Sequence, residues 1–238
     1  HNGRSTETFR NEGHFDIIQK QLRPGDFVVI QFGHNDQKHP HLQAYNGYPE
    51  NLRRFIAEIR ANKALPILAT PIARNTWTEQ NGTLAYNDLL HDHAQACIAL
   101  GKELNVPVLD LHQAAMDEII RLGRDASKIY YHQGDWTHTN DYGAVRAAGY
   151  AADELRSPDG KFPDYLPLIR AVSAPEKVGR WEPEAALLLE KPARLAGVKD
   201  PNGAEEGTAA QDHQAEKDGG DALARLLAVV QSARGQSV

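Results

Sequence analysis

The sequence contains a single cysteine, Cys97, among its 238 residues. A disulfide framework within the chain and a cysteine-rich zinc site are therefore excluded, and we expect Cys97 to be a small buried hydrophobic residue. No stretch approaches the roughly 20 apolar residues that a membrane-spanning helix needs. Basic residues are also scarce, 26 Lys and Arg against 32 Asp and Glu. This acidic balance argues against a chain built mainly to bind nucleic acid or an anionic membrane.

Aromatic residues are almost absent from the last part of the chain. Of the 3 Trp, 8 Tyr and 6 Phe residues, only Trp181 lies beyond Arg170. With so few large apolar side chains, residues 171–238 have little to offset the entropy lost on ordering. We therefore divide the chain into a folded domain, 1–170, and a flexible extension, 171–238, in which only 184–189 and 222–230 have helical patterns.

The first 170 residues alternate between short β-branched runs and amphipathic stretches. The pattern predicts strands at 27–32, 65–70 and 106–110, and helices at 48–62, 84–104, 111–122 and 141–155. Strands separated by helices of this length imply a parallel sheet covered on both faces, so the fold class is α/β. In such sheets, ligands gather beyond the carboxyl ends of the strands.

Asn35 follows the first predicted strand and its exit glycine, Gly33. A neutral amide in this position can stabilise a developing oxyanion without titrating. The alternative is that Asn35 and Asp36 only form an Asx-turn.

Asp135 and His138 lie in the loop before the last predicted helix. An aspartate three residues before a histidine can accept the Nδ1 proton in a turn, which leaves Nε2 as a general base. The other interpretation is a helix start, with Thr139 or Asn140 as the cap. Both can hold together, because a cap does not use the imidazole.

Gly3 offers a much weaker signal, a backbone N–H that could be a second oxyanion donor. Metal binding has little support among the 11 histidines. His91 and His93 lie two residues apart in a predicted helix and point to different faces, and the pair His39 and His41 has no nearby helical carboxylate. We therefore expect no metal and no cofactor.

Taken together, these segments resemble the SGNH (GDSL-type) hydrolases, and most closely their rhamnogalacturonan acetylesterase-like branch. The resemblance covers residues 1 to about 160 and is carried by 2–9, by Glu-Gly at 12–13, by 24–37 with its Phe-Gly-His-Asn-Asp string, and by Asp-Trp-Thr-His-Thr at 135–139. It implies a flavodoxin-like three-layer α/β/α sandwich. It also implies that Gly3 and Asn35 are oxyanion donors, that His138 is the base, and that Asp135 orients it.

The family's first block, Gly-Asp-Ser, which supplies the nucleophilic serine, occurs nowhere in the sequence. Ser5 is the nearest serine, but it follows the glycine of the second block and no strand precedes it to present it. We therefore expect no nucleophile in the chain as given, and we expect the missing block on an amino-terminal strand about 30 to 50 residues before Gly3, the length of one strand–helix–strand unit.

The resemblance predicts a serine esterase that removes acetyl groups from pectin-type polysaccharide, present as a fragment without its nucleophile block. The alternative is a non-catalytic carbohydrate-binding or interaction module that keeps the cleft. In either case the partner is an acetylated oligo- or polysaccharide. Without the first strand, strand 27–32 would expose an unpaired edge through which the chain could self-associate.

Overall fold

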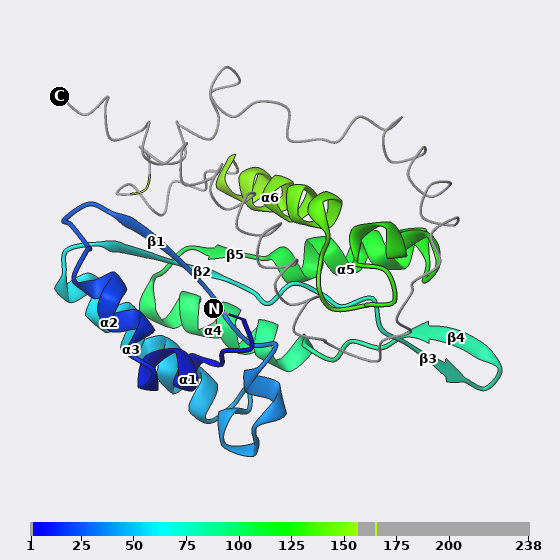
Figure 1. Ribbon diagram of the computed structural model, residues 1–238, viewed down its shortest axis with the longest axis horizontal. Helices are drawn as coiled ribbons and strands as arrows, with labels where there is room; N and C mark the ends of the chain where they lie inside the picture. Colours follow the sequence, from blue (N-terminus) through cyan, green and yellow to red (C-terminus); the bar gives the residue numbers. More distant parts are fainter. Residues whose placement is uncertain (1, 157–164, 166–238) are drawn as a thin grey trace.

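The computed structural model describes residues 2–156 and 165. Three parallel strands form its main sheet in the order β1 (Phe27–Gln31), β2 (Leu65–Ala69) and β5 (Val108–Leu109). Helices α3 (Gly47–Ala61) and α4 (His91–Leu104) cover one face, and α5 (Leu111–Leu122) and α6 (Asp141–Arg156) cover the other (Figure 1). The predicted α/β class and the three-layer sandwich are confirmed.

Apolar side chains from both faces hold the helices on the sheet. Helix α3 buries its predicted stripe, Leu52, Phe55, Ile56 and Ile59, against the strands. On the other face, α5 and α6 pack against β2 and β5 through residues such as Ile67, Leu109, Ile119, Ala152 and Leu155. Cys97 is buried in the first of these cores, as expected.

Two short helices precede the sheet, α1 (Thr6–Asn11) and α2 (His14–Gln19). Short 3-10 turns, Asp36–Lys38 and Pro40–Leu42, follow β1. The turn Ala126–Tyr130 links α5 to the loop before α6. None of these short helices was predicted, because six residues or fewer carry too little periodicity to be recognised.

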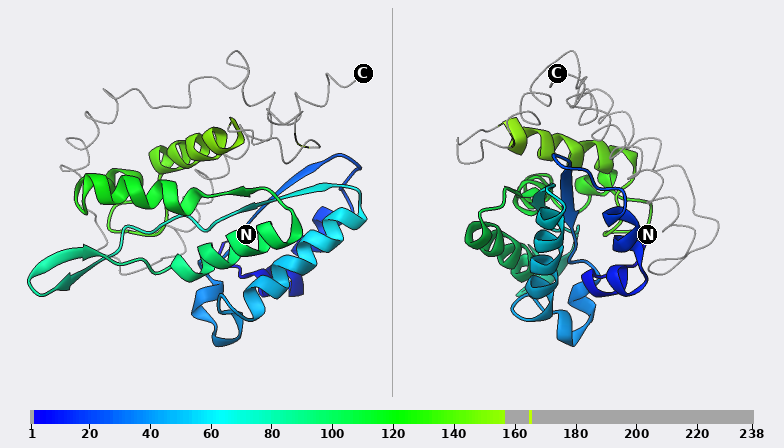
Figure 2. Two further views of the ribbon diagram at one scale, coloured as in Figure 1. Left: turned by 180° about the vertical axis from the view of Figure 1, so that it is seen from behind. Right: turned by 90° about the vertical axis from the view of Figure 1, so that its left-hand side faces the viewer.

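The predicted helix 84–104 is wrong in its first third. Residues Trp77–Gln80 and Thr83–Tyr86 form an antiparallel hairpin, β3–β4, and α4 begins only at His91. Asn81 and Gly82 both have positive φ, 52° and 75°, as a two-residue hairpin turn requires. The hairpin projects from one end of the molecule (Figures 1 and 2).

The strand predicted at 106–110 is reduced to two paired residues, Val108–Leu109. Pro107 has no N–H to donate and contributes only its carbonyl, which accepts from the Leu68 N–H at 2.9 Å. The other predicted elements agree with the structure to within two residues.

The expected extension, 171–238, and its helical pieces at 184–189 and 222–230 lie outside the described residues. Within the described part, no helix has both the length and the apolar character needed to cross a bilayer. At the described edge of the sheet, β1 pairs with β2 alone, and Val29 is 39% exposed there.

Candidate active site

Asp135 and His138 meet in the loop before α6, as the sequence predicts. The Asp135 Oδ2 lies 2.6 Å from the His138 Nδ1. The other oxygen, Oδ1, accepts from the backbone N–H groups of Thr137 (2.6 Å) and His138 (3.1 Å). The carboxylate thus folds the turn and orients the imidazole at the same time.

The loop itself is held at both ends. Tyr131 and Thr139 form an antiparallel bridge, and the His132 N–H donates to the His138 carbonyl at 3.1 Å. The Asp135 side chain is 8% exposed, whereas that of His138 is 35% exposed. The imidazole is therefore accessible to a substrate, while the carboxylate behind it is shielded.

Electrostatics keep Asp135 ionised. Burial disfavours its charge, but the hydrogen bond with His138 and the two backbone N–H donors outweigh burial and lower the pKa of Asp135 to about 2. An ionised carboxylate fixes Nδ1 as the donor, so Nε2 becomes the nitrogen that can take a proton from a nucleophile.

The helix-start interpretation of this segment also holds. The Asn140 Oδ1 accepts from the N–H groups of Tyr142 (3.0 Å) and Gly143 (3.1 Å), so Asn140 caps α6. Its Nδ2 donates to the carbonyls of Ile129 and Tyr131, both at 2.9 Å. The cap leaves the imidazole of His138 uninvolved, as the sequence analysis allows.

Asn35 and the Gly3 segment lie together beyond the carboxyl end of β1. The Asn35 Nδ2 donates to the Arg4 carbonyl at 3.4 Å. Gly3 is exposed and has φ of +69°, a left-handed conformation that suits glycine. Both predicted oxyanion donors are thus at one end of the sheet.

His34, beside Asn35, has an imidazole whose protonation is disfavoured. Its pKa is lowered to about 3, first by burial, then by the charge of Arg74, with smaller contributions from His138 and His112. Because the Asn75 N–H, in the segment after β2, donates to the Trp136 carbonyl at 2.8 Å, the loop that holds His138 lies beyond the carboxyl ends of the strands, as Asn35 does. That the His138 ring faces Asn35 across one cleft stays a prediction.

Hydrogen bonds of Asp36 and Asn51 clamp these segments, a role that the sequence did not predict. Asp36 is fully buried, and its Oδ1 accepts from the Thr6 N–H (3.0 Å) and the Thr6 hydroxyl (2.5 Å). Asn51 on α3 donates to the same hydroxyl at 3.0 Å. Asp36 therefore makes a long-range clamp rather than the local Asx-turn, and the signal that could have revealed it is its place beside Asn35 in the Phe-Gly-His-Asn-Asp string.

The segment after β2 is hydrogen-bonded both to the segment after β1 and to Tyr131. The Arg74 guanidinium donates to the His34 carbonyl at 3.2 Å, and the His34 Nε2 lies 3.0 Å from the Ile72 carbonyl. The Tyr131 hydroxyl donates to the Ala73 carbonyl at 2.9 Å. Hydrogen bonds thus connect the segments after β1 and β2 to the loop that precedes α6.

The serines of the described residues have structural roles. Ser5 is 1% exposed and caps α1, since its Oγ accepts from the Thr8 N–H at 3.1 Å. Ser127 is fully buried and donates to the Gly123 carbonyl at 2.8 Å. Neither hydroxyl is presented at the end of a strand beside His138.

The rings of His39 and His41 lie with their centroids 5.8 Å apart, whereas His91 and His93 lie in different surroundings. His91 is exposed and lies 3.4 Å from Asp88, whereas His93 is buried against Tyr48. Among residues 2–156 and 165, no group of three or more His, Cys, Asp and Glu side chains is arranged to hold a metal ion.

Known proteins are similar to this chain in sequence, and one solved structure is similar to it in fold. RhgT, a rhamnogalacturonan acetylesterase of Bacillus subtilis (strain 168), is 31% identical over 177 residues, which are 69% of this chain and 75% of RhgT. YesY, a probable rhamnogalacturonan acetylesterase of the same strain, is 30% identical over 65% of this chain and 73% of its own length. The crystal structure of YxiM from Bacillus subtilis matches with a TM-score of 0.55 and 30% identity, over 65% of this chain and 43% of YxiM.

The GDSL-like Lipase/Acylhydrolase family matches residues 1–146, which include both predicted oxyanion segments and the pair Asp135 and His138. The match and the parallel sheet agree with the resemblance inferred from the motifs. This chain belongs to the GDSL-like lipase/acylhydrolase family.

Proposed function

We propose that this chain provides the general base, its orienting carboxylate and the oxyanion donors of a carbohydrate acetylesterase. The observation that carries the proposal is the 2.6 Å contact between the Asp135 Oδ2 and the His138 Nδ1, in a loop that is hydrogen-bonded to the segment after β2. The acetylesterase relatives RhgT and YesY support acetylated, pectin-type polysaccharide as the substrate.

In the proposed reaction, a serine hydroxyl attacks the acetyl carbonyl carbon while the His138 Nε2 takes the hydroxyl proton. The Gly3 N–H and the Asn35 amide stabilise the oxyanion, and Asp135 stabilises the imidazolium. The sugar alkoxide leaves with the proton from His138. Water, deprotonated by His138, then attacks the acyl-serine, and acetate and the free serine hydroxyl result. No metal or other cofactor takes part in this scheme.

The serine of this scheme is not Ser5 or Ser127, whose hydroxyls are engaged in structural hydrogen bonds. We propose that it belongs to a Gly-Asp-Ser segment absent from the sequence given. The chain as given then has little or no esterase activity, because residual groups cannot open the acyl-enzyme route without a nucleophile.

The test compares the chain as given with a version extended at its amino terminus by a strand–helix–strand segment that carries the Gly-Asp-Ser block. Acetate release from acetylated rhamnogalacturonan and turnover of p-nitrophenyl acetate are measured for both. We expect activity only in the extended protein and its loss in the extended His138→Ala variant. Equal turnover by the two parent proteins would show that the nucleophile has been misplaced.

The engaged serines also favour a second candidate, a non-catalytic carbohydrate-binding module that keeps the cleft of the family. The same comparison separates the two candidates. If the extended protein binds acetylated rhamnogalacturonan but releases no acetate, the binding module is correct.

We also propose that the chain as given self-associates through β1. In the described sheet, β1 pairs only with β2, and Val29 is 39% exposed beside the outer edge. An unpaired strand edge is a template for pairing with a second chain. Size-exclusion chromatography should show dimers or larger species for the chain as given and monomers for the extended protein, whereas a monomeric chain with a sharp melting transition would contradict this proposal.

A further inference from the structure

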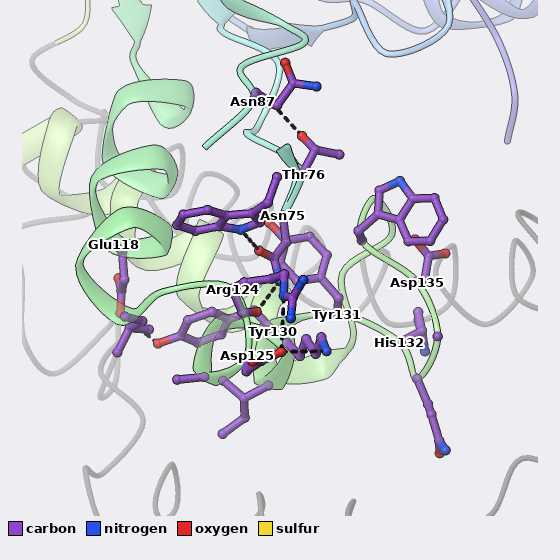
Figure 3. Close-up of a pocket in the computed structure, with 18 of the residues that line it drawn as sticks. Asn75, Thr76, Asn87, Glu118, Arg124, Asp125, Tyr130, Tyr131, His132 and Asp135 are labelled. Atoms are coloured by element: carbon purple, nitrogen blue, oxygen red, sulfur yellow. Dashed lines mark hydrogen bonds and ion pairs between the residues drawn. The ribbon is translucent and has the colours of Figure 1, made fainter. Parts of the chain in front are cut away.

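A cavity of about 1260 Å³ lies beside the catalytic loop, on the side of the β3–β4 hairpin (Figure 3). Its walls are the hairpin base, the carboxyl end of α5, the turn Ala126–Tyr130 and the loop that ends at Asp135 and Trp136. The volume exceeds the roughly 300–1,000 Å³ usual for a small-molecule site. It is therefore large enough for more than one sugar ring.

Asn75 ties three of these walls together. Its backbone N–H donates to the Trp136 carbonyl at 2.8 Å, and its Nδ2 donates to the Arg124 carbonyl at 3.0 Å. Its Oδ1 accepts from the Trp77 indole N–H at 2.6 Å. The cavity is thus built from hydrogen-bonded segments, and a ligand in it would contact the same loop that positions His138.

Aromatic rings line the cavity, and the polar atoms of Trp77, Tyr130 and Tyr131 are already engaged. The Tyr130 and Tyr131 hydroxyls donate to Glu118 (2.7 Å) and to the Ala73 carbonyl (2.9 Å), so these rings offer mainly apolar surface. Trp77 packs edge-on against Tyr86 with ring centroids 5.6 Å apart. Trp136 is 39% exposed at the cavity. Rigid aromatic faces of this kind suit the flat apolar faces of sugar rings.

The exposed charges around the cavity are mainly positive. Arg121, Arg124 and Lys128 have side chains that are 68%, 48% and 62% exposed, and Asp125 is the exposed carboxylate among them. These four groups carry a surplus of two positive charges in a chain with net charge −6.

The other two carboxylates that line the cavity are occupied. Glu118 accepts from Tyr130 and from the Arg146 guanidinium at 2.7 Å, and Asp135 is held by His138. The ion pairs of Asp125 with Arg124 (3.4 Å) and Lys128 (2.8 Å) are on the surface, where such pairs contribute little and can be exchanged for a ligand carboxylate.

We propose that this cavity binds the sugar residues next to the acetylated one in an acidic polysaccharide. In this arrangement Trp136 stacks on a sugar ring, and Arg124 and Lys128 receive the carboxylate of a uronic acid. The assignment rests on the proposed acetylesterase function for its choice of ligand, but it is tested by binding rather than by catalysis.

The test measures binding of unesterified oligogalacturonide to the chain as given by isothermal titration calorimetry, with a neutral galacto-oligosaccharide of equal length as the comparison ligand. We expect the acidic ligand to bind at least 10-fold more tightly than the neutral one. The Arg124→Gln/Lys128→Gln double variant should lose at least 10-fold in affinity and most of the salt dependence. Trp136→Ala should weaken the binding of both ligands.

Matched control variants remove two cations or one aromatic ring from positions outside the cavity. The Arg54→Gln/Lys102→Gln variant removes two exposed cations from α3 and α4, and Tyr45→Ala removes an aromatic ring that is 75% exposed. Both should bind like the parent. Because Arg124 and Lys128 are on the surface, their double variant is expected to fold, so the proposal remains testable even if Trp136→Ala unfolds.

Absence of binding at millimolar oligogalacturonide, or equal binding by the parent and the Arg124→Gln/Lys128→Gln variant, would overturn the assignment. The outcome is separable from that of the proposed function. Retained binding with no acetate release by the extended protein refutes the esterase alone. Acetate release that is unaffected by the double variant, with no change in binding, refutes the subsite alone.

Discussion

Two aspartates at the same end of the sheet have pKa values shifted in opposite directions. Asp36, after β1, is fully buried, and burial raises its pKa despite hydrogen bonds from Thr6. Asp135, before α6, is also shielded, but hydrogen bonds from His138 and two backbone N–H groups lower its pKa to about 2. The same side chain is therefore used in two ways within one site.

The difference lies in the partners. The Asp36 donors, the N–H and the hydroxyl of Thr6, both reach one oxygen, and Oδ2 has no hydrogen-bond partner among the described residues. At Asp135 both oxygens are engaged, one of them by a group that can carry a positive charge. The neutral donors at Asp36 do not outweigh burial, so its pKa is raised, whereas a partner that can carry a positive charge helps to keep Asp135 ionised.

The largest expected effect separates the two aspartates by activity. In the protein extended with the Gly-Asp-Ser segment, Asp135→Asn should lower kcat/KM about 10⁴-fold, because an amide favours the wrong imidazole tautomer. The Asn Oδ1 can still accept from the Thr137 and His138 N–H groups, so the turn should persist. Steady-state kinetics on p-nitrophenyl acetate check this, and a loss below 10-fold would remove Asp135 from the catalytic machinery.

The next largest effect is on stability and concerns Asp36. Asp36→Ala should lower the free energy of unfolding by about 3 kcal/mol, since it leaves the buried Thr6 N–H and hydroxyl without their acceptor. Asp117→Ala, at an exposed position of α5, is the control and should change the stability by less than about 0.5 kcal/mol. Urea unfolding of both variants would decide, and equal stabilities would mean that the clamp is dispensable.

Acid titration sharpens the comparison further. The native pKa of Asp135 lies below its ordinary value of 3.8, so the stability it contributes is present above pH 3.8 and is lost as the pH falls to about 2. That contribution is about 2 kcal/mol. Asp135→Asn should therefore be less stable than the parent at pH 6 and approach it near pH 2.

Asp36 has the opposite linkage. Its native pKa is raised, so the folded state takes up a proton more readily than the unfolded state, and Asp36 favours folding increasingly as the pH falls toward 3.8. Asp36→Asn should consequently lose stability on acidification more steeply than the parent. Thermal melts between pH 2 and 7 measure both slopes, and parallel curves for the two Asn variants would refute the contrast.

The smallest effect concerns Ser5. Ser5→Ala should cost about 1 kcal/mol, the usual contribution of a helix N-cap, because the Thr8 N–H loses its acceptor. In the extended protein, esterase activity should be unchanged. A loss of activity that exceeds the loss of folded protein would instead identify Ser5 as the nucleophile.

Local signals in the sequence predicted much of the fold. The stripe from Leu52 to Ile59 located α3, and the β-branched run before Gly33 located β1, since burial on a helix or a sheet imposes its period on neighbouring residues. The hairpin was missed although Asn81-Gly82 is a strong turn signal, because the apolar residues after it also fitted a helical period.

The sequence by itself determined the α/β class, the family and the pairing of Asp135 with His138, because each is recorded in short stretches of neighbouring residues. Only the tertiary structure decided the clamp between Asp36 and Thr6, 30 residues apart, and the cavity that Asn75 joins to Trp136 and Arg124. Contacts of this kind depend on how strands and loops are brought together in space. The hydrophobic periodicity of a single segment therefore cannot predict them.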